Sequence, residues 1–238
     1  MLNQVKSKRI TSNKILQQIN SEIKRSEPNY IAIFDLDDTV FDTSFRRIFI
    51  YEQYLPKIYD LPILNPILQK KHYNFIPLIK KNAVFQEYRS EIIKFFFKLF
   101  LSEQFLFLDR PFPGIKPFLD SLIKLDIPII YLTGRLASTI RKGTFAMLEK
   151  YGLPNSLKRQ TYLRMKINEK TSDNSYKKRE LKRLINQYPE KKFLIFDNES
   201  RNCSMFNESL PNDSIIVRFN SVQKKYSHYE GYLLNSWE

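Results

Sequence analysis

The feature that most constrains this 238-residue chain is a repeated pattern in which an apolar run ends in a cluster of polar side chains. The apolar runs cover residues 30–34, 127–132 and 192–196. The polar clusters that follow them cover residues 35–39, 133–135 and 197–199. The runs have the length and β-branched content of buried parallel strands. Because open parallel sheets bind ligands beyond the carboxyl ends of their strands, the pattern predicts that the three clusters share one site.

Helical patterns separate these runs along the chain. They cover residues 115–125, 136–151, 176–188 and 201–210. Two weaker strand candidates lie at 161–165 and 214–218. Strands that alternate with helices form right-handed βαβ units. We therefore expect an α/β fold, with a Rossmann-like, doubly wound parallel sheet and helices on both of its faces.

The long interval between the first two predicted strands divides the chain. Residues 44–110 are rich in Phe, Tyr, Ile and Lys, contain a long helical pattern near 83–107, and far exceed the length of a normal crossover. We interpret them as a helical cap insertion beside the site, whose aromatic side chains pack between cap and body. Residues 30–43 and 111–238 then form the α/β core, and residues 1–29 form an amphipathic helical extension.

Composition excludes several classes of protein. With 5 Gly and neither GxGxxG nor GxxxxGK[ST], the chain lacks the fingerprints of dinucleotide-binding enzymes and P-loop kinases. The single Cys203 cannot form an intramolecular disulfide, and no apolar run is long enough for a signal peptide or a membrane span. We expect a cytoplasmic protein that does not bind membranes.

The net charge of +14 admits a polyanionic partner such as nucleic acid, but the basic residues are spread along the chain instead of forming one stripe. Net charge alone is weak evidence for a partner. We expect a small phosphorylated substrate and keep nucleic acid as the alternative.

The polar clusters suggest phosphoryl transfer. Asp35 and Asp37 leave the first strand together, so one carboxylate can act as nucleophile while the other transfers protons. A carboxylate that attacks phosphorus needs charge neutralisation, which Mg²⁺ supplies through oxygen ligands, and Asp197 can complete such a site. Thr133 offers a hydroxyl and backbone N–H groups at the predicted start of a helix, a natural phosphate cradle.

These residues resemble the four ordered motifs of the haloacid dehalogenase superfamily. The motifs are the stretch 34–39 (FDLDDT), the stretch 132–135 (LTGR), the lysine region 177–178 and the stretch 196–199 (FDNE). The resemblance spans residues 30–218, and the YLTGR version, preceded by RPFPG, is most similar to the acid-phosphatase-like branch.

The resemblance implies a role for each matching residue. Asp35 would form an aspartyl-phosphate, and Asp37 would first protonate the leaving oxygen and then activate water. Thr39 would steady the loop beside the substrate, and Thr133 and Gly134 would hold the phosphoryl oxygens. The implied ligands of Mg²⁺ are Asp35, the Asp37 carbonyl, Asp197 and Asn198.

Three assignments stay open at this point. Lys177 fits the motif's lysine because Leu181 and Leu184 then fall at helical spacing, but Lys178 is one step away. Asn198 stands where many relatives carry a second Asp, so Glu199 is an alternative ligand. Arg135 contacts either the substrate or a structural carboxylate.

The second carboxylate, Asp37, favours a phosphohydrolase over a dehalogenase. We therefore expect a phosphomonoesterase. The alternatives are a phosphatase that acts on nucleic-acid ends and a catalytically weak protein of this fold with a binding or regulatory role.

Overall fold

A computed structural model describes residues 12–25, 29–60, 88–155, 160–210, 213–223 and 229–238. Its centre is a six-stranded sheet in the order β5-β4-β1-β6-β7-β8, and every neighbouring pair in this sheet is parallel. The strands are β1 (Tyr30–Phe34), β4 (Ile129–Leu136), β5 (Thr161–Lys166), β6 (Lys192–Asp197), β7 (Ile215–Phe219) and β8 (Tyr232–Leu234). The predicted α/β class with a doubly wound parallel sheet is confirmed, and β8 was not predicted.

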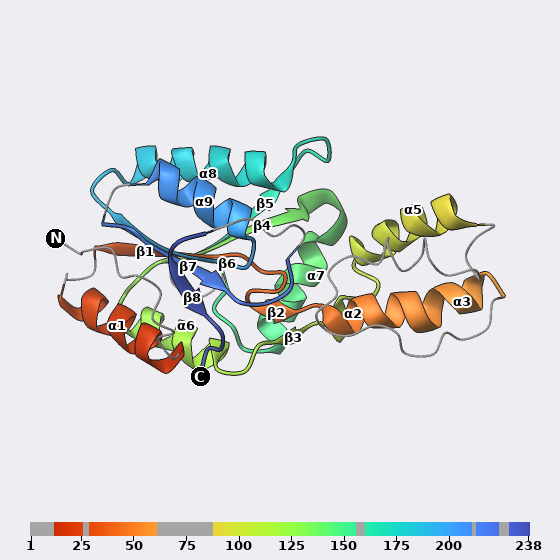
Figure 1. The fold of residues 1–238 in the computed structure, drawn as a ribbon, viewed down its shortest axis with the longest axis horizontal. Helices are drawn as coiled ribbons and strands as arrows, with labels where there is room; N and C mark the ends of the chain where they lie inside the picture. The colour runs from red at the N-terminus through yellow and green to blue at the C-terminus, as the bar shows by residue number, and fades with distance from the viewer. Residues whose placement is uncertain (1–11, 26–28, 61–87, 156–159, 211–212, 224–228) are drawn as a thin grey trace.

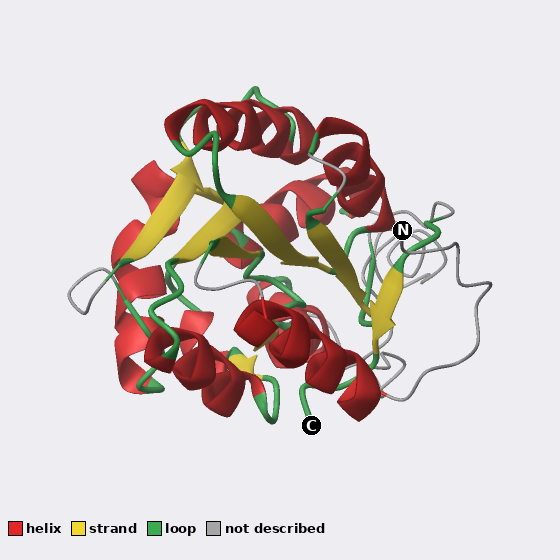
Figure 2. Ribbon diagram, turned by 90° about the vertical axis from the view of Figure 1, so that its left-hand side faces the viewer, coloured by secondary structure: helices red, strands yellow, loops and turns green. Residues whose placement is uncertain are grey.

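Helices cover both faces of this sheet (Figures 1 and 2). One face carries α8 (Asp173–Gln187) and α9 (Ser200–Ser209), and the other carries α1 (Ser12–Arg25), α6 (Ile115–Lys124) and α7 (Ala137–Lys150). The alternation along β1 serves both layers, because Ala32 and Phe34 pack into one core cluster whereas Ile31 and Ile33 pack into the other. No helix in the described part of the chain is long and apolar enough to cross a membrane.

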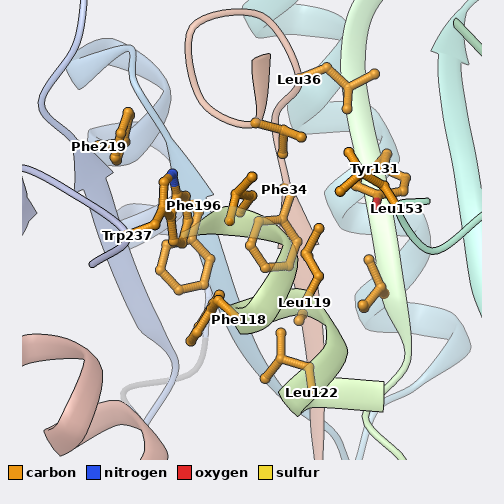
Figure 3. Close-up of a cluster of buried hydrophobic side chains, with 14 of the residues drawn as sticks. Phe34, Leu36, Phe118, Leu119, Leu122, Tyr131, Leu153, Phe196, Phe219 and Trp237 are labelled. Carbon is orange, nitrogen blue, oxygen red and sulfur yellow. The ribbon is translucent and has the colours of Figure 1, made fainter. Parts of the chain in front are cut away.

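Aromatic rings fill the core on the α6 face directly below the predicted catalytic loop (Figure 3). Phe34 stacks on Phe196 with ring centroids 4.9 Å apart, and Phe118 meets Phe196 edge-on at 5.4 Å. Trp237 packs 5.0 Å from Phe196 and donates its indole N–H to the Thr39 carbonyl at 3.2 Å. The C-terminal segment therefore supports the loop that follows β1.

Gly114 is the N-cap residue of α6 and has a backbone φ of +80°, and a Cβ at this position would lie 2.6 Å from the carbonyl oxygen of Trp237. We expect Gly114→Ala to lower the free energy of unfolding by about 2–3 kcal/mol, measured by urea denaturation. Gly152→Ala is the matched control, because Gly152 has a φ of +60° but its added Cβ would come no nearer than 3.4 Å to the Lys116 side chain. Equal losses in the two variants would contradict the proposed backbone clash.

The predicted cap region projects away from the sheet (Figure 1). Its described helices are α2 (Ser44–Phe49), the π-helix η1 (Ile50–Tyr54), α3 (Leu55–Ile58), α5 (Arg89–Phe100) and the 3-10 helix η3 (Leu106–Leu108). The short strands β2 (Phe41–Asp42) and β3 (Arg110–Pro111) pair antiparallel where this region leaves and rejoins the core. Residues 61–87 lie outside the described residues, and the domain boundaries stay a prediction.

Two expectations about the cap were wrong in detail. The helix predicted to reach residue 107 ends at Phe100, because the chain turns there and the Ser102 hydroxyl caps the Leu99 carbonyl at 2.7 Å. The aromatic side chains pack mainly within the cap instead of between cap and body: Phe96 and Phe105 are buried in the cap's own cluster, whereas Phe107 is 57% exposed.

Candidate active site

Lys177 joins the ends of two adjacent strands through their carboxylates. Its ammonium lies 2.6 Å from Oδ1 of Asp35, which follows β1, and 2.7 Å from Oδ2 of Asp197, which ends β6. All three side chains are buried. Lys178 is exposed on the outer side of α8, so the geometry selects Lys177 as the lysine of the site.

The electrostatics of this trio call for further positive charge. Burial raises the pKa of Asp35 well above its usual range, Lys177 opposes this rise, and Asp197 adds to it. Burial by itself would lower the pKa of Lys177, but the two carboxylates raise it above its usual value. When both buried carboxylates are ionised they share one ammonium and carry a net negative charge, and the raised pKa of Asp35 reflects the cost of this excess.

The donor set fits Mg²⁺. Mg²⁺ usually binds through one or two carboxylates and keeps several waters, and Asp35 and Asp197 supply two carboxylates. Among the described residues, no group of three or more His, Cys, Asp or Glu side chains is arranged to hold a metal ion. The remaining oxygens would come from the backbone carbonyl of Asp37, from the predicted ligand Asn198 or its alternative Glu199, and from water.

Asn202, which sequence reasoning missed, holds Asp197 in place. Its amide donates to both carboxylate oxygens of Asp197, at 3.2 and 3.1 Å, and accepts from Asn174 at 3.1 Å. The backbone N–H of Glu199 also donates to Asp197 at 2.8 Å. The available signal was position: Asn202 lies in the first turn of the helix that follows the motif.

Asn198 ties two loops together. Its side-chain oxygen accepts from the Thr39 hydroxyl at 3.3 Å, and its amide nitrogen donates to the Val222 carbonyl. Thr39 thereby links the loop after β1 to the loop after β6. The side-chain oxygen of Asn198 keeps a second lone pair that could bind a metal ion. The roles of Asn198 or Glu199 as metal ligands stay predictions.

The expected place of Thr133 at a helix N-terminus was wrong. β4 continues through Leu136 with a register irregularity after Thr133, and α7 begins only at Ala137. The Thr133 hydroxyl accepts from the N–H of Arg135 at 3.2 Å. The phosphate cradle would therefore be a strand-end bulge and not the first turn of a helix.

A carboxylate lies close to Gly134. A Cβ at this position would approach Cγ of Asp173 to 2.6 Å, so only glycine fits without a shift of Asp173. Lys166 pairs with Asp173 at 2.8 Å. The negative charge beside the predicted cradle is thus partly neutralised.

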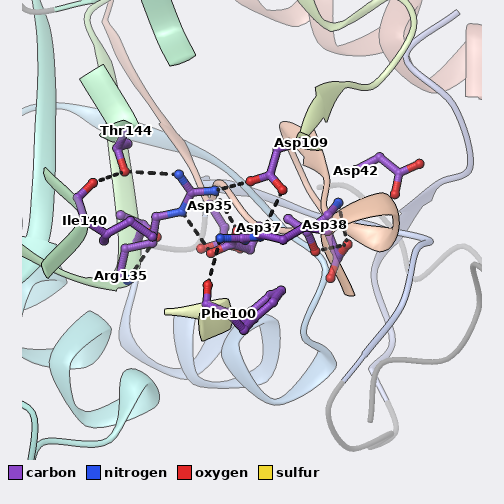
Figure 4. A network of polar contacts seen from close by, with 12 residues as sticks. Asp35, Asp37, Asp38, Asp42, Phe100, Asp109, Arg135, Ile140 and Thr144 are labelled. Carbon is purple, nitrogen blue, oxygen red and sulfur yellow. Dashed lines mark hydrogen bonds and ion pairs between the residues drawn. The ribbon is translucent and has the colours of Figure 1, made fainter. Parts of the chain in front are cut away.

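Asp37 lies in a network of four buried or half-buried charges (Figure 4). Arg135 holds it through two bonds, Nε to Oδ2 at 3.1 Å and Nη2 to Oδ1 at 2.7 Å. Arg46 from α2 adds a bond to Oδ1 at 3.1 Å. Asp109 pairs with the other sides of both arginines, at 3.0 Å from Arg46 and 3.1 Å from Arg135. Arg135 therefore forms salt bridges with carboxylates of the protein.

The carboxylates of this network titrate differently. Burial would raise the pKa of Asp37, but Arg135 and Arg46 outweigh it and lower the pKa well below its usual range. Burial raises the pKa of Asp109 to about 6 against the opposing pull of the same arginines. Asp37 is therefore an ionised carboxylate, the form required of a general base.

Asp38 and Asp42 shape the loop that follows β1. Asp38 adopts a φ of 58° and forms a buried ion pair with Arg47 at 2.6 Å. The Thr43 hydroxyl also donates a hydrogen bond to Asp38 at 2.9 Å. Asp42 accepts from the N–H of Ser44 at 2.9 Å and so caps the start of α2. These contacts fix the chain between β1 and the cap.

The comparisons with known proteins agree with this geometry at the level of the fold. No protein-family model and no curated protein matches the sequence. Solved structures do match: a HAD-superfamily hydrolase of subfamily IA from Geobacter sulfurreducens shares 11% identity over 89% of this chain and 94% of its own, with a TM-score of 0.59. A haloacid dehalogenase-like hydrolase from Streptococcus pneumoniae shares 13% identity over 82% and 88%, with a TM-score of 0.52. The chain has the haloacid dehalogenase fold.

The same fold also occurs in the protein tyrosine kinase A of Mycobacterium tuberculosis, which shares 16% identity over 88% of this chain and 94% of its own, with a TM-score of 0.57. At these identities the likeness concerns the fold, and the chemistry depends on the site. The haloacid dehalogenase fold brings Asp35, Lys177 and Asp197 together at adjacent strand ends, as the motifs predicted.

Arg46 and Asp109 are two further members of the site that sequence reasoning did not find. Both lie inside the predicted cap insertion, Arg46 just after its start and Asp109 just before its end. Their charge at the two ends of the insert was the available signal. Nothing local identified their partners, because Asp109 lies 26 residues before Arg135 and Arg46 lies 54 residues before its backbone partner Phe100.

Proposed function

We propose that the chain is a Mg²⁺-dependent phosphohydrolase that cleaves phosphomonoesters through an aspartyl-phosphate on Asp35. The observation that carries this proposal is the buried ammonium of Lys177 shared by Asp35 and Asp197. Such a site can align a carboxylate nucleophile and offset the charge of an incoming phosphate. The hydrolases that share the fold support the same chemistry.

In the proposed first step, a carboxylate oxygen of Asp35 attacks phosphorus and the bond to the leaving oxygen breaks. Thr133 and Gly134 would hold the phosphoryl oxygens, and Lys177 would offset their charge. Asp37 is ionised in the free site, so it would first take up a proton from solvent and then deliver that proton to the leaving oxygen. Mg²⁺, when bound, supplies Lewis-acid stabilisation of the phosphoryl charge.

In the proposed second step, Asp37 removes a proton from water, whose oxygen attacks the phosphorus of the aspartyl-phosphate. Inorganic phosphate leaves and the Asp35 carboxylate returns. The proposed substrate is a small phosphorylated molecule in the cytoplasm. A phosphorylated nucleic-acid end, the alternative, depends on the net charge of +14 and would show a strong dependence on salt.

Hydrolysis of p-nitrophenyl phosphate tests the proposal. We expect turnover with Mg²⁺, loss of turnover after chelation with EDTA, and recovery when Mg²⁺ is returned. Absence of turnover with Mg²⁺, Mn²⁺ and Co²⁺ alike would contradict the assignment and favour a binding or regulatory role for the fold.

The support of Asp197 by Asn202 gives a quantitative prediction. We expect Asn202→Ala to raise the Mg²⁺ concentration for half-maximal activity about 10- to 100-fold, because residues that orient metal ligands typically have effects of this size. Titration of Mg²⁺ in the p-nitrophenyl phosphate assay measures it. Asn207→Ala, an exposed position on the same helix, is the matched control and should leave the midpoint unchanged. An unchanged midpoint in Asn202→Ala would remove Asp197 from the metal site.

A further inference from the structure

Two buried guanidinium groups meet at the carboxylate of Asp37. The side chains of Arg46 and Arg135 are each 1% exposed, whereas that of Asp37 is 30% exposed. Asp37 therefore forms the solvent-exposed side of the network, which we call its open side, and Asp109, at 1% exposure, forms the buried side. In this arrangement the two positive charges are balanced by two negative charges (Figure 4).

The arginines keep other anchors that do not involve Asp37. Arg46 donates to the Phe100 carbonyl at 2.8 Å, and its guanidinium lies 4.0 Å from the centre of the Phe100 ring. Arg135 donates to the Thr144 hydroxyl at 3.1 Å. Together with Asp109, these contacts hold both guanidinium groups in place if the Asp37 carboxylate turns away.

A turn of Asp37 towards a leaving oxygen would upset the charge balance. Arg46 and Arg135 would then share Asp109 alone and keep one buried positive charge without a partner. Buried charges are stable only when they are paired and hydrogen-bonded. A second anion from the open side would restore the balance, and the two-bond grip of Arg135 on Asp37 shows that the position accepts a carboxylate.

We propose that the substrate is a phosphomonoester that also carries a carboxylate, and that this carboxylate takes the place of the Asp37 side chain between Arg46 and Arg135. This inference rests on the proposed phosphohydrolase function and specifies its substrate class. Arg46 then determines specificity from the cap side, and Arg135 does so from the core. Binding of such a substrate favours the release of Asp37 for proton transfer.

A matched pair of substrates tests the inference. 3-(Phosphonooxy)propanoate and propyl phosphate share a carbon skeleton and differ by the carboxylate. We expect the wild-type chain to prefer the first in kcat/KM by about 10- to 100-fold, the effect of one charge-assisted contact. Arg46→Gln should reduce this preference to within about threefold, mainly through KM for the carboxylate-bearing ester, and Arg46→Lys should restore part of it.

Arg110→Gln is the matched control, because Arg110 is exposed at the same junction and contacts Phe45 instead of the network. It should keep the wild-type preference. Equal kcat/KM for the two esters in the wild-type chain would overturn the inference even if Arg46→Gln does not fold. An equal loss on both esters in a folded Arg46→Gln variant would also overturn it, because a purely structural role predicts that result.

The two proposals can fail separately. If neither ester nor p-nitrophenyl phosphate is hydrolysed, the phosphohydrolase assignment fails. The dissociation constants of the two esters, measured by calorimetry with Mg²⁺ present, still decide the inference: tighter binding of the carboxylate-bearing ester supports it, and equal binding overturns it.

Discussion

Asp35→Asn is expected to abolish Mg²⁺-dependent hydrolysis of p-nitrophenyl phosphate, with a loss in kcat of at least about 10⁴-fold, the scale seen when a covalent nucleophile is removed. The amide has nearly the shape of the carboxylate but cannot attack phosphorus. The measurement is kcat at saturating substrate and Mg²⁺, with the variant purified free of wild-type enzyme.

The same substitution should not unfold the protein. Burial makes the pKa of Asp35 higher in the folded state than in the unfolded state. The folded protein therefore loses stability as pH rises from the unfolded-state pKa of Asp35 to its folded-state pKa. At neutral pH the neutral amide therefore avoids that cost, and the midpoint of thermal unfolding should stay level or rise. Asp42→Asn is the control on the same loop, since an amide oxygen can still accept from Ser44. Activity within tenfold of wild type in Asp35→Asn would exclude Asp35 as the nucleophile.

Lys177→Gln should reduce kcat by about 10²- to 10³-fold, because it removes a preorganised charge beside the reacting group. It also leaves the buried Asp35 and Asp197 carboxylates without their shared ammonium, and breaking a buried ion pair costs about 3–5 kcal/mol of unfolding free energy. The loss of stability should be largest at neutral pH and should shrink as acid protonates the carboxylates. Urea denaturation at several pH values measures it.

Lys178→Gln separates this effect from general loss of positive charge. Its side chain is exposed on the same helix, so activity should stay within about twofold and stability within about 0.5 kcal/mol of wild type. Similar losses in the two variants would show that net charge, and not the bridge between Asp35 and Asp197, governs the site.

The sequence was most informative where local pattern and strand-end geometry act together. β1 and β6 follow from short apolar runs, and the parallel sheet requires that their carboxyl ends meet, so Asp35 and Asp197 could be placed before any coordinates. Sequence alone leaves Lys177 and Lys178 as alternatives. One residue step rotates a side chain by about 100° around a helix, so the packing of α8 decides which lysine faces inwards.

Other parts of the site depend on contacts that no local pattern encodes. Arg46 and Asp109 meet Arg135 only because the cap region folds back beside the catalytic loop. The extension of β4 to Leu136 likewise follows from its pairing with Lys166 across the sheet. Sequence pattern therefore placed Asp35 and Asp197 at one edge of the sheet, and tertiary packing selected Lys177 and determined the surroundings of Asp37.

The pairing of β2 with β3 makes the two ends of the cap neighbours, with Asp42 opposite Arg110. A two-residue turn between these positions would close an ordinary β-hairpin, so the chain could pass from the first strand to α6 without the intervening region. Loop-closure entropy grows only slowly with length once the ends are fixed. Evolution could thus lengthen, shorten or exchange this region as a module while the sheet and its catalytic loop persist.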